Sequence, residues 1–345
     1  MEQACDAGFW EAAWRLADTL GCFFQLRAHW DDWQHTHAMA LTGARRAGDH
    51  DAQGRILASL GAFHIYRNRI DAAICWLDQS LAAFRETGNR HGELECLVDL
   101  GLTGLKQGRF DDATNLLEQS LAGFQETGAR SCEAVTLFHL GDVHYQQGRL
   151  DSALACLEQS LTLIRALGDR PWEAPILRSL GLTHSKQGRF AEAVACLDQS
   201  LTLVCALGDR QGQAHVLRGF GEVYAKQGCL GDAAGCLEQS LTLARATGDR
   251  GAVACTLYTL GEVRRQQGRL EEAASCLEPS LATFHDIGFR PWEARALNSF
   301  GMLLATRGDL AAACRVWRSA LAIFRELDMP EAAEVASWLE DQGGT

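Results

Sequence analysis

The sequence predicts an all-α solenoid of about eight helix pairs closed by one further helix, because a unit of 40 residues recurs along the chain. Gly181 has counterparts at every multiple of 40, namely Gly21, Gly61, Gly101, Gly141, Gly221, Gly261 and Gly301. Leu201 recurs in the same way, as Leu41, Leu81, Leu121, Leu161, Leu241, Leu281 and Leu321. A fixed period of this length is typical of repeats whose apolar faces are buried only when neighbouring units stack.

Each unit is expected to hold two helices. Within residues 167–210, apolar or small residues recur at spacings of three and four, first from Ala174 to His184 and then from Ala193 to Val204. Glycines follow both runs and supply the left-handed residue that ends a helix, at Gly168, Gly188 and Gly208. Polar residues placed to cap the next helix come directly after such glycines, at Asn89, Asp169, Asp209 and Asp249.

Gly181 lies inside the first helix of its unit, where a glycine costs about 1 kcal/mol relative to alanine. Because the chain keeps this glycine in every unit, something must approach the helix closely there. Ala193 in the second helix is also small and also recurs. We therefore expect the two helices of a unit to touch at Gly181 and Ala193.

The units follow one another in a simple order. Residues 1–48 are predicted to form a degenerate first unit, residues 49–328 seven units of 40 residues, and residues 329–345 a capping helix and tail. This arrangement predicts seventeen helices. Pro279 falls in the middle of its helix, which is expected to bend or break there.

The first unit is rich in aromatic residues, including Phe9, Trp10 and Trp14. One interpretation is a terminal cap, since terminal repeats are commonly atypical. The alternative is a docking end for a second copy of the chain or for an upstream domain. The docking interpretation predicts that these three side chains are exposed to solvent.

Leu180, Gly181, His184, Gly188, Phe190, Ala193, Leu197 and Leu201 together resemble the signature of the tetratricopeptide repeat (TPR), in a long-helix variant. The resemblance implies a right-handed superhelix in which the first helix of each pair lines a concave groove. A more specific resemblance comes from the opening WRLADTLGCFFQLRAHWDDW and from unit ends such as FRETGNR and LGDR. They resemble the C-terminal sensor arrays of actinobacterial antibiotic regulators and related STAND-type signal-transduction ATPases. Their nucleotide-binding domain and winged helix have no counterpart here, so the resemblance implies partner sensing without ATP hydrolysis or DNA binding.

Composition argues against several classes of function. The formal net charge is −12, which disfavours nucleic-acid binding. We find neither an apolar run of the ~18 residues that span a bilayer nor a signal peptide, and expect a soluble cytoplasmic protein without membrane contact. Four cysteines that share one repeat position are interpreted as small core residues: Cys156, Cys196, Cys236 and Cys276.

No catalytic or phosphate-binding motif is present, so the chain is not expected to be an enzyme or to carry a cofactor. His35 and His37 are two residues apart and point to different sides of a helix, which disfavours a shared metal ion. An enzyme that uses groove pairs such as Arg218 with Glu222, or Glu262 with Arg265, is the least favoured alternative. Such neighbours on one helix are usually ion pairs.

The groove-facing positions vary from unit to unit while the packing positions stay constant, which indicates a surface for a peptide or protein segment. A terminal-carboxylate clamp of the kind known in this family is not matched, because Leu182 and Glu222 stand at its asparagine position. The preferred function is the sensor or docking module of a bacterial regulator, and the alternative is a stand-alone peptide-responsive sensor or adaptor. The predicted partner-binding residues are Phe138, Asp142, Tyr145, Arg178, Lys186, His215, Arg218, Glu222, Tyr258, Glu262, Arg295 and Asn298.

Overall fold

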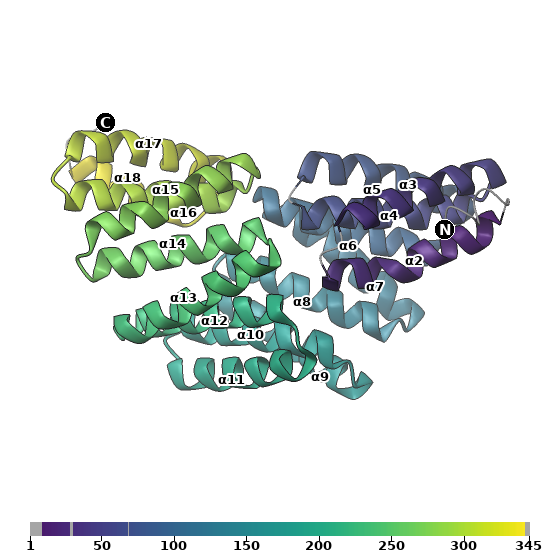
Figure 1. The fold of residues 1–345 in the computed structure, drawn as a ribbon, viewed down its shortest axis with the longest axis horizontal. Helices are drawn as coiled ribbons and strands as arrows, with labels where there is room; N and C mark the ends of the chain where they lie inside the picture. The colour runs from purple at the N-terminus through teal and green to yellow at the C-terminus, as the bar shows by residue number, and fades with distance from the viewer. Residues whose placement is uncertain (1–8, 28–29, 68, 342–345) are drawn as a thin grey trace. The chain divides into compact units, whose positions relative to one another are not determined.

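The computed structural model describes residues 9–27, 30–67 and 69–341, and within these ranges the chain is entirely helical, without strands. The seventeen predicted helices are present in the described ranges (Figure 1). They are α2 (Trp10–Arg27), α3 (Trp30–Ala47), α4 (His50–Tyr66), α5 (Ile70–Thr87), α6 (Arg90–Gln107), α7 (Phe110–Thr127), α8 (Arg130–Gln146), α9 (Leu150–Leu167), α10 (Arg170–Lys186), α11 (Phe190–Leu207), α12 (Arg210–Lys226), α13 (Leu230–Thr247), α14 (Arg250–Gln266), α15 (Leu270–Asp286), α16 (Arg290–Thr306), α17 (Leu310–Glu326) and α18 (Glu331–Asp341).

The chain divides into two compact units, residues 1–136 and 137–345. In the first unit α2 packs on α3, α4 on α5, and α6 on α7. In the second unit the pairs are α10 with α11, α12 with α13, α14 with α15, and α16 with α17. The first helices also touch one another in series, α10 with α12, α12 with α14, and α14 with α16, so they form a layer of their own.

Helix ends are set by local chemistry, largely as the sequence predicts. Gly168, Gly188 and Gly208 adopt φ values of 71°, 77° and 66°, in the left-handed region. Asp209 caps α12 by accepting a hydrogen bond from the Gly212 amide at 2.8 Å, and Asn89 and Asp249 cap their helices in the same way. Asp169 makes no such bond, although the Trp172 amide three residues later is available, and nothing in the structure explains the difference.

The helices of a pair touch at Gly181 and Ala193, as expected, and a leucine side chain also lies against the glycine. A methyl group on Gly181 would lie 3.0 Å from the Ala193 carbonyl oxygen and 3.0 Å from Leu197 Cγ. The equivalent position at Gly221 would meet Leu237 at 2.5 Å. The glycine therefore makes room for a leucine side chain and a backbone carbonyl, not for the alanine methyl.

A buried serine in the second helix ties five of the pairs together, and sequence reasoning passed over it. Ser80 Oγ donates to the Gly54 carbonyl at 2.7 Å, and Ser200 Oγ to the Ala174 carbonyl at 2.7 Å. Ser120, Ser240 and Ser280 make the same bond, always to a residue 26 positions earlier. The recurring Gln-Ser-Leu sequence or its Pro-Ser-Leu variant was the available signal.

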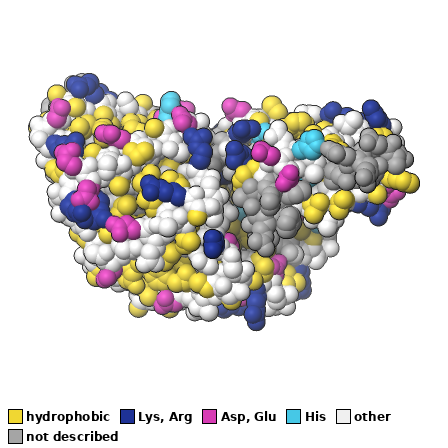
Figure 2. Space-filling model, in the orientation of Figure 1, with side chains coloured by type: hydrophobic (Ala, Val, Ile, Leu, Met, Phe, Trp, Pro, Cys, Tyr) yellow, Lys and Arg dark blue, Asp and Glu magenta, His cyan; other side chains and the backbone are white. Residues whose placement is uncertain are grey.

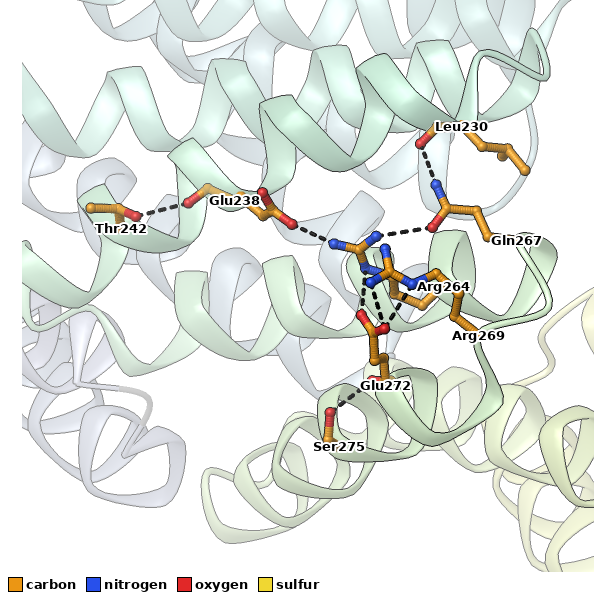
Figure 3. Close-up of polar contacts among 8 residues, drawn as sticks. All are labelled: Leu230, Glu238, Thr242, Arg264, Gln267, Arg269, Glu272 and Ser275. Atoms are coloured by element: carbon orange, nitrogen blue, oxygen red, sulfur yellow. Dashed lines mark hydrogen bonds and ion pairs between the residues drawn. The ribbon is translucent and has the colours of Figure 1, made fainter.

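The aromatic position of the repeat has a packing role, as expected, and at His64 the ring contacts the second helix of its own pair. His64 stacks on Trp76 with ring centroids 6.4 Å apart. In the α14 repeat the ring is replaced by Arg264, whose guanidinium pairs with Glu238 of α13 and lies 3.5 Å from Glu272 of α15 (Figure 3). A buried arginine with two carboxylate partners thus links three helices where packing alone links them elsewhere.

Pro279 does not break its helix, and four free cysteines are less buried than expected. Helix α15 runs unbroken through Pro279, because both the proline and Ser275, whose carbonyl loses its helical partner, lie on the exposed side where water replaces the lost bond. The four cysteines of one repeat position are half-buried rather than core residues.

One described helix, α11, is long and apolar enough to cross a membrane when judged by length and composition alone, contrary to the sequence expectation. It carries Glu192 and Asp198 and packs on α10 as the second helix of an ordinary repeat. These features favour a helix of the repeat array.

Candidate partner-binding groove

The first helices of residues 137–345 bring polar and aromatic side chains together on their shared layer. We call this the inner cluster: Tyr145 of α8, Lys186 of α10, Arg218 and Glu222 of α12, Tyr258 and Glu262 of α14, and Arg295 of α16. Lys186 Nζ lies 4.0 Å from the centroid of the Tyr145 ring and donates to the Tyr145 carbonyl at 3.2 Å. The charges of Glu222, Arg295 and Arg218 all act on the Tyr145 hydroxyl.

Arg295 connects the two ends of this layer. Its Nη1 donates to Gln146 Oε1 of α8 at 2.9 Å, and its Nε donates to Glu331 Oε1 of α18 at 2.8 Å. The guanidinium also lies over the Trp292 ring, 5.4 Å from the centroid. This one side chain therefore holds three helices that are far apart in sequence.

Arg218 is the most enclosed cation of the cluster. Its side chain is 10% exposed and pairs with Glu222 one helical turn later. Its Nε is buried without a hydrogen-bond partner among the described residues. The cluster therefore retains an unused, oriented donor.

Burial shifts the ionisation of the cluster. Desolvation, with repulsion from the Arg295 charge, lowers the pKa of Lys186 to about 8. Burial and the Glu262 carboxylate raise the pKa of Tyr258 to about 12. Lys186 is exposed as a residue, and its ammonium contacts the ring and the carbonyl of Tyr145.

Asp142 and Arg178 lie beside the inner cluster. Ser179 Oγ donates to Asp142 Oδ1 at 2.9 Å, while burial raises the pKa of Asp142 and the Arg178 charge opposes that rise. Burial also lowers the pKa of Arg178. The Arg178 charge and the Asp142 carboxylate thus each favour the charged form of the other, against the effect of burial.

Three predicted groove residues have other partners. Phe138 is buried and meets the Trp172 ring edge-on, with centroids 5.9 Å apart. His215 lies 3.9 Å from Asp249 in the turn before α14. The backbone carbonyl of Asn298 accepts a bond from Trp317, while its Oδ1 is buried without a partner in the part of the chain described.

Sequence reasoning missed Gln146, Trp172, Trp292 and Glu331. Trp172 and Trp292 stand 120 residues apart in the same repeat position, inside identical Arg-Pro-Trp-Glu-Ala sequences, and this was a usable signal. Tyr258 packs on Trp292 as Phe138 packs on Trp172. Glu331 lies beyond the repeats, so no periodic comparison could have found it.

At the proposed docking end, only Phe9 is largely exposed, at 66%. Trp10 packs on Gly43 and beneath Arg46, and Trp14 packs on the core around Ala17 and Leu41. The expectation that both tryptophans are exposed is therefore wrong, because Gly43 of α3 makes room for the Trp10 indole and Trp14 packs on a core cluster that includes Ala40 and Ala44 of α3.

Acidic, basic and apolar side chains are interspersed on the face seen in Figure 2, without a continuous basic surface. Among the described residues, the one group of three metal-ligating side chains close to one another lies outside the inner cluster, at His91, Glu95 and Cys132. The inner cluster is thus suited to recognising mixed charge and aromatic groups, and offers no ready metal site.

The stacked helix pairs and their shared inner layer define an α-helical repeat scaffold. The chain belongs to the tetratricopeptide repeat family, whose models match residues 60–126, 132–206, 212–286 and 258–328. The predicted repeat is thereby confirmed. No curated protein sequence matches the chain.

Several solved structures share the fold. A Rap protein complexed with competence and sporulation factor is 12% identical, with a TM-score of 0.67 over 95% of this chain and 96% of that one. The Rap conjugation gene regulator of plasmid pLS20, in complex with the Phr* peptide, is 16% identical, with a TM-score of 0.68 over 86% and 84%. Aspartyl phosphate phosphatase F from Bacillus subtilis is 10% identical, with a TM-score of 0.63 over 82% and 72%.

Proposed function

We propose that this chain is a non-enzymatic scaffold that binds a peptide or protein segment along the first helices of residues 137–345. The observation that carries the proposal is the inner cluster itself, in which cations, carboxylates and tyrosines from five repeats act on one another. Burying a charge is costly unless a partner offsets it, so the stability of the core alone does not account for this set of charged side chains.

The chemistry of the cluster suits an extended peptide. Lys186 and the unused Nε of Arg218 offer donors for peptide carbonyls or acidic side chains. Tyr145 and Tyr258 offer ring faces and edges for apolar side chains. A groove that presents both kinds of contact at intervals of one repeat matches the way in which peptides are commonly bound by helical arrays.

The likeness in fold to a regulator solved with a peptide supports this proposal, although at 16% identity it concerns the fold. The aspartyl phosphate phosphatase is only 10% identical, so its likeness also concerns the fold and gives no reason to assign its activity to this chain. The pairs Arg218–Glu222 and Glu262–Arg265, which an enzyme would need free, bond within their own helices. These pairs favour binding over catalysis.

The finer assignment is the sensor module of a cytoplasmic bacterial regulator, related to the arrays of antibiotic regulators and STAND-type ATPases. It depends on the sequence of the opening segment and of the unit ends. A docking role for the N-terminal end, with a second copy or another domain, depends mainly on the exposed Phe9, because Trp10 and Trp14 are half-buried. A stand-alone peptide-responsive sensor is the alternative.

Selection of a random peptide library on the purified chain, followed by calorimetry with the enriched peptides, tests the proposal. Lys186→Glu is expected to weaken binding at least about tenfold, because it reverses a charge inside the cluster. Arg245→Glu is the matched control, since Arg245 is exposed on the second helix α13 and the change in net charge is the same. Failure to enrich any peptide, or equal loss in both variants, would contradict the proposal.

A further inference from the structure

His91 and Glu95 of α6 and Cys132 of α8 form a compact group within residues 9–136. One ligand atom from each, a histidine nitrogen, a carboxylate oxygen and the thiol sulfur, lies within 4.8 Å of the other two. His91 and Glu95 are one helical turn apart and point the same way, with His91 Nε2 3.4 Å from Glu95 Oε1. Cys132 comes from the first turn of the next first helix, so two neighbouring repeats contribute.

The repeat does not require these residues. The position of Cys132 is occupied in other units by Gly92, Trp172, Gly212, Ala252 and Trp292. The position of Glu95 is occupied by Arg55, Val135, Pro175, His215, Cys255 and Arg295. Only at this junction do the three positions carry a histidine, a carboxylate and a thiol together, so packing does not explain the combination.

The three donors are those that a borderline-soft divalent ion takes. Zinc binds thiolate at about 2.3 Å and imidazole or carboxylate at about 2.0–2.2 Å, which places its ligands about 3.3–3.7 Å apart. His91 Nε2 and Glu95 Oε1 are already 3.4 Å apart. The other separations are within 4.8 Å and need only a small rotation of the exposed His91 and Glu95 side chains. One thiolate and one carboxylate also balance the charge of a divalent cation.

We propose that His91, Glu95 and Cys132 form a binding site for a divalent transition-metal ion of the zinc class, with water as the remaining ligand. On binding, the Cys132 thiol loses its proton to the buffer and the sulfur–metal bond forms, without any change of oxidation state. The ion would join α6 to α8 and so link two consecutive repeats. This site lies apart from the inner cluster and goes beyond the proposed function.

The competing explanation is an ordinary helix ion pair between His91 and Glu95, with Cys132 as a bystander. Both side chains of that pair are about half exposed, and such pairs contribute little. The two explanations differ in whether sulfur binds the ion. Cobalt(II) reports this directly, because a thiolate ligand adds an intense charge-transfer absorption in the near ultraviolet.

The test is a titration of the reduced full chain with CoCl₂, followed by displacement with ZnCl₂. We expect the charge-transfer band to saturate at one cobalt per chain and to vanish on adding zinc. Cys132→Ser is expected to abolish the band, while His91→Gln and Glu95→Gln weaken cobalt binding at least about tenfold. Each change is conservative, and circular dichroism checks that the helices remain.

Because the chain contains 13 cysteines and 11 histidines, a matched control is needed. Cys196→Ser removes a half-buried thiol of α11, in the other unit, and is expected to leave the band unchanged. A band that survives Cys132→Ser, or no band in the unchanged chain, overturns the proposal. Loss of peptide binding in the Lys186→Glu variant would not affect the band, so the two proposals fail independently.

Discussion

Arg295 in α16 donates a hydrogen bond to Gln146 in α8, a residue 149 positions earlier in the chain, at 2.9 Å. The same guanidinium holds Glu331 of α18 at 2.8 Å. Within residues 137–345 the successive repeats therefore curve until the first and last inner helices meet. A ligand that enters the inner cluster must fit beneath this connection or replace it.

Replacement of Arg295 by alanine should remove both bonds and leave Glu331 without its partner. We expect the free energy of unfolding to fall by about 1–3 kcal/mol, because bonds to charged groups contribute about that much. Urea denaturation followed by circular dichroism measures the change. Arg269→Ala is the matched control, since Arg269 is half exposed and pairs with Glu272 alone among the residues that the structure describes, and its loss should cost less than about 1 kcal/mol.

Glu222→Gln should destabilise the chain more than the removal of both charges does. The single change leaves the enclosed Arg218 guanidinium without a counter-charge, at a cost of about 2–4 kcal/mol. The double variant Arg218→Met, Glu222→Leu removes the buried charge altogether and is expected to recover part of that loss. The single variants Arg218→Met and Glu222→Leu complete a double-mutant cycle, in which urea denaturation measures the coupling, and additive effects of the two sites would contradict a buried pair.

His37 predicts a pH dependence of stability. Its Nδ1 donates to the Trp33 carbonyl at 3.0 Å, and the Ser59 hydroxyl, which accepts from Trp33 Nε1, donates to His37 Nε2 at 2.9 Å. This network satisfies the neutral ring, and a second ring proton would face the hydroxyl that now donates. Burial lowers the pKa of His37 to about 4, although the backbone bond acts in the other direction.

Because an unfolded histidine binds a proton below about pH 6.5, the unfolded chain holds more protons between pH 6.5 and pH 4. The contribution of the neutral, buried His37 to stability is thus complete above about pH 6.5 and is lost as the pH falls. The free energy of unfolding should be lower by about 2 kcal/mol at pH 5. His37→Gln keeps a donor and an acceptor but cannot bind a proton in this range. Its free energy of unfolding should therefore lack this part of the dependence on pH. His35→Gln, on the exposed face of the same helix, should retain it, as measured by denaturation at pH 7.5 and pH 5.

Two helix-interior glycines should respond to alanine in opposite directions. At Gly181 the new methyl group would lie 3.0 Å from the Ala193 carbonyl oxygen, and this backbone atom cannot move without separating the helices. We expect Gly181→Ala to lower stability by about 1–2 kcal/mol. At Gly235 in α13 nothing lies within 4 Å of the added methyl, so Gly235→Ala should raise stability by about 1 kcal/mol. Equal effects in a thermal melt would refute the close approach.

The repeat, the number of helices and most helix ends could be predicted from the sequence. They depend on short-range interactions that recur from unit to unit. Gly188 ends a helix through its own left-handed backbone, and Asp209 caps one through an amide three residues away. There are two exceptions. Asp169 makes no capping bond, and Pro279 is accommodated because its helix face meets water.

The groove residues were predicted as a set, because their repeat positions vary from unit to unit while the packing positions stay constant. The residues that each of them contacts were not predicted. Lys186 on Tyr145 joins consecutive repeats and is within reach of periodic reasoning. Trp10 over Gly43 follows from the shape of the first pair, and no repeat position encodes it. The ligand group at His91, Glu95 and Cys132 is visible only once α6 and α8 are placed beside each other.

Periodicity alone settled that this chain is a stack of helix pairs, because a pattern of apolar residues and glycines acts through neighbours a few positions away. Which charges meet was settled by the tertiary structure. Each repeat adds a small rotation to the one before, and only the accumulated rotation brings Arg295 back to Gln146.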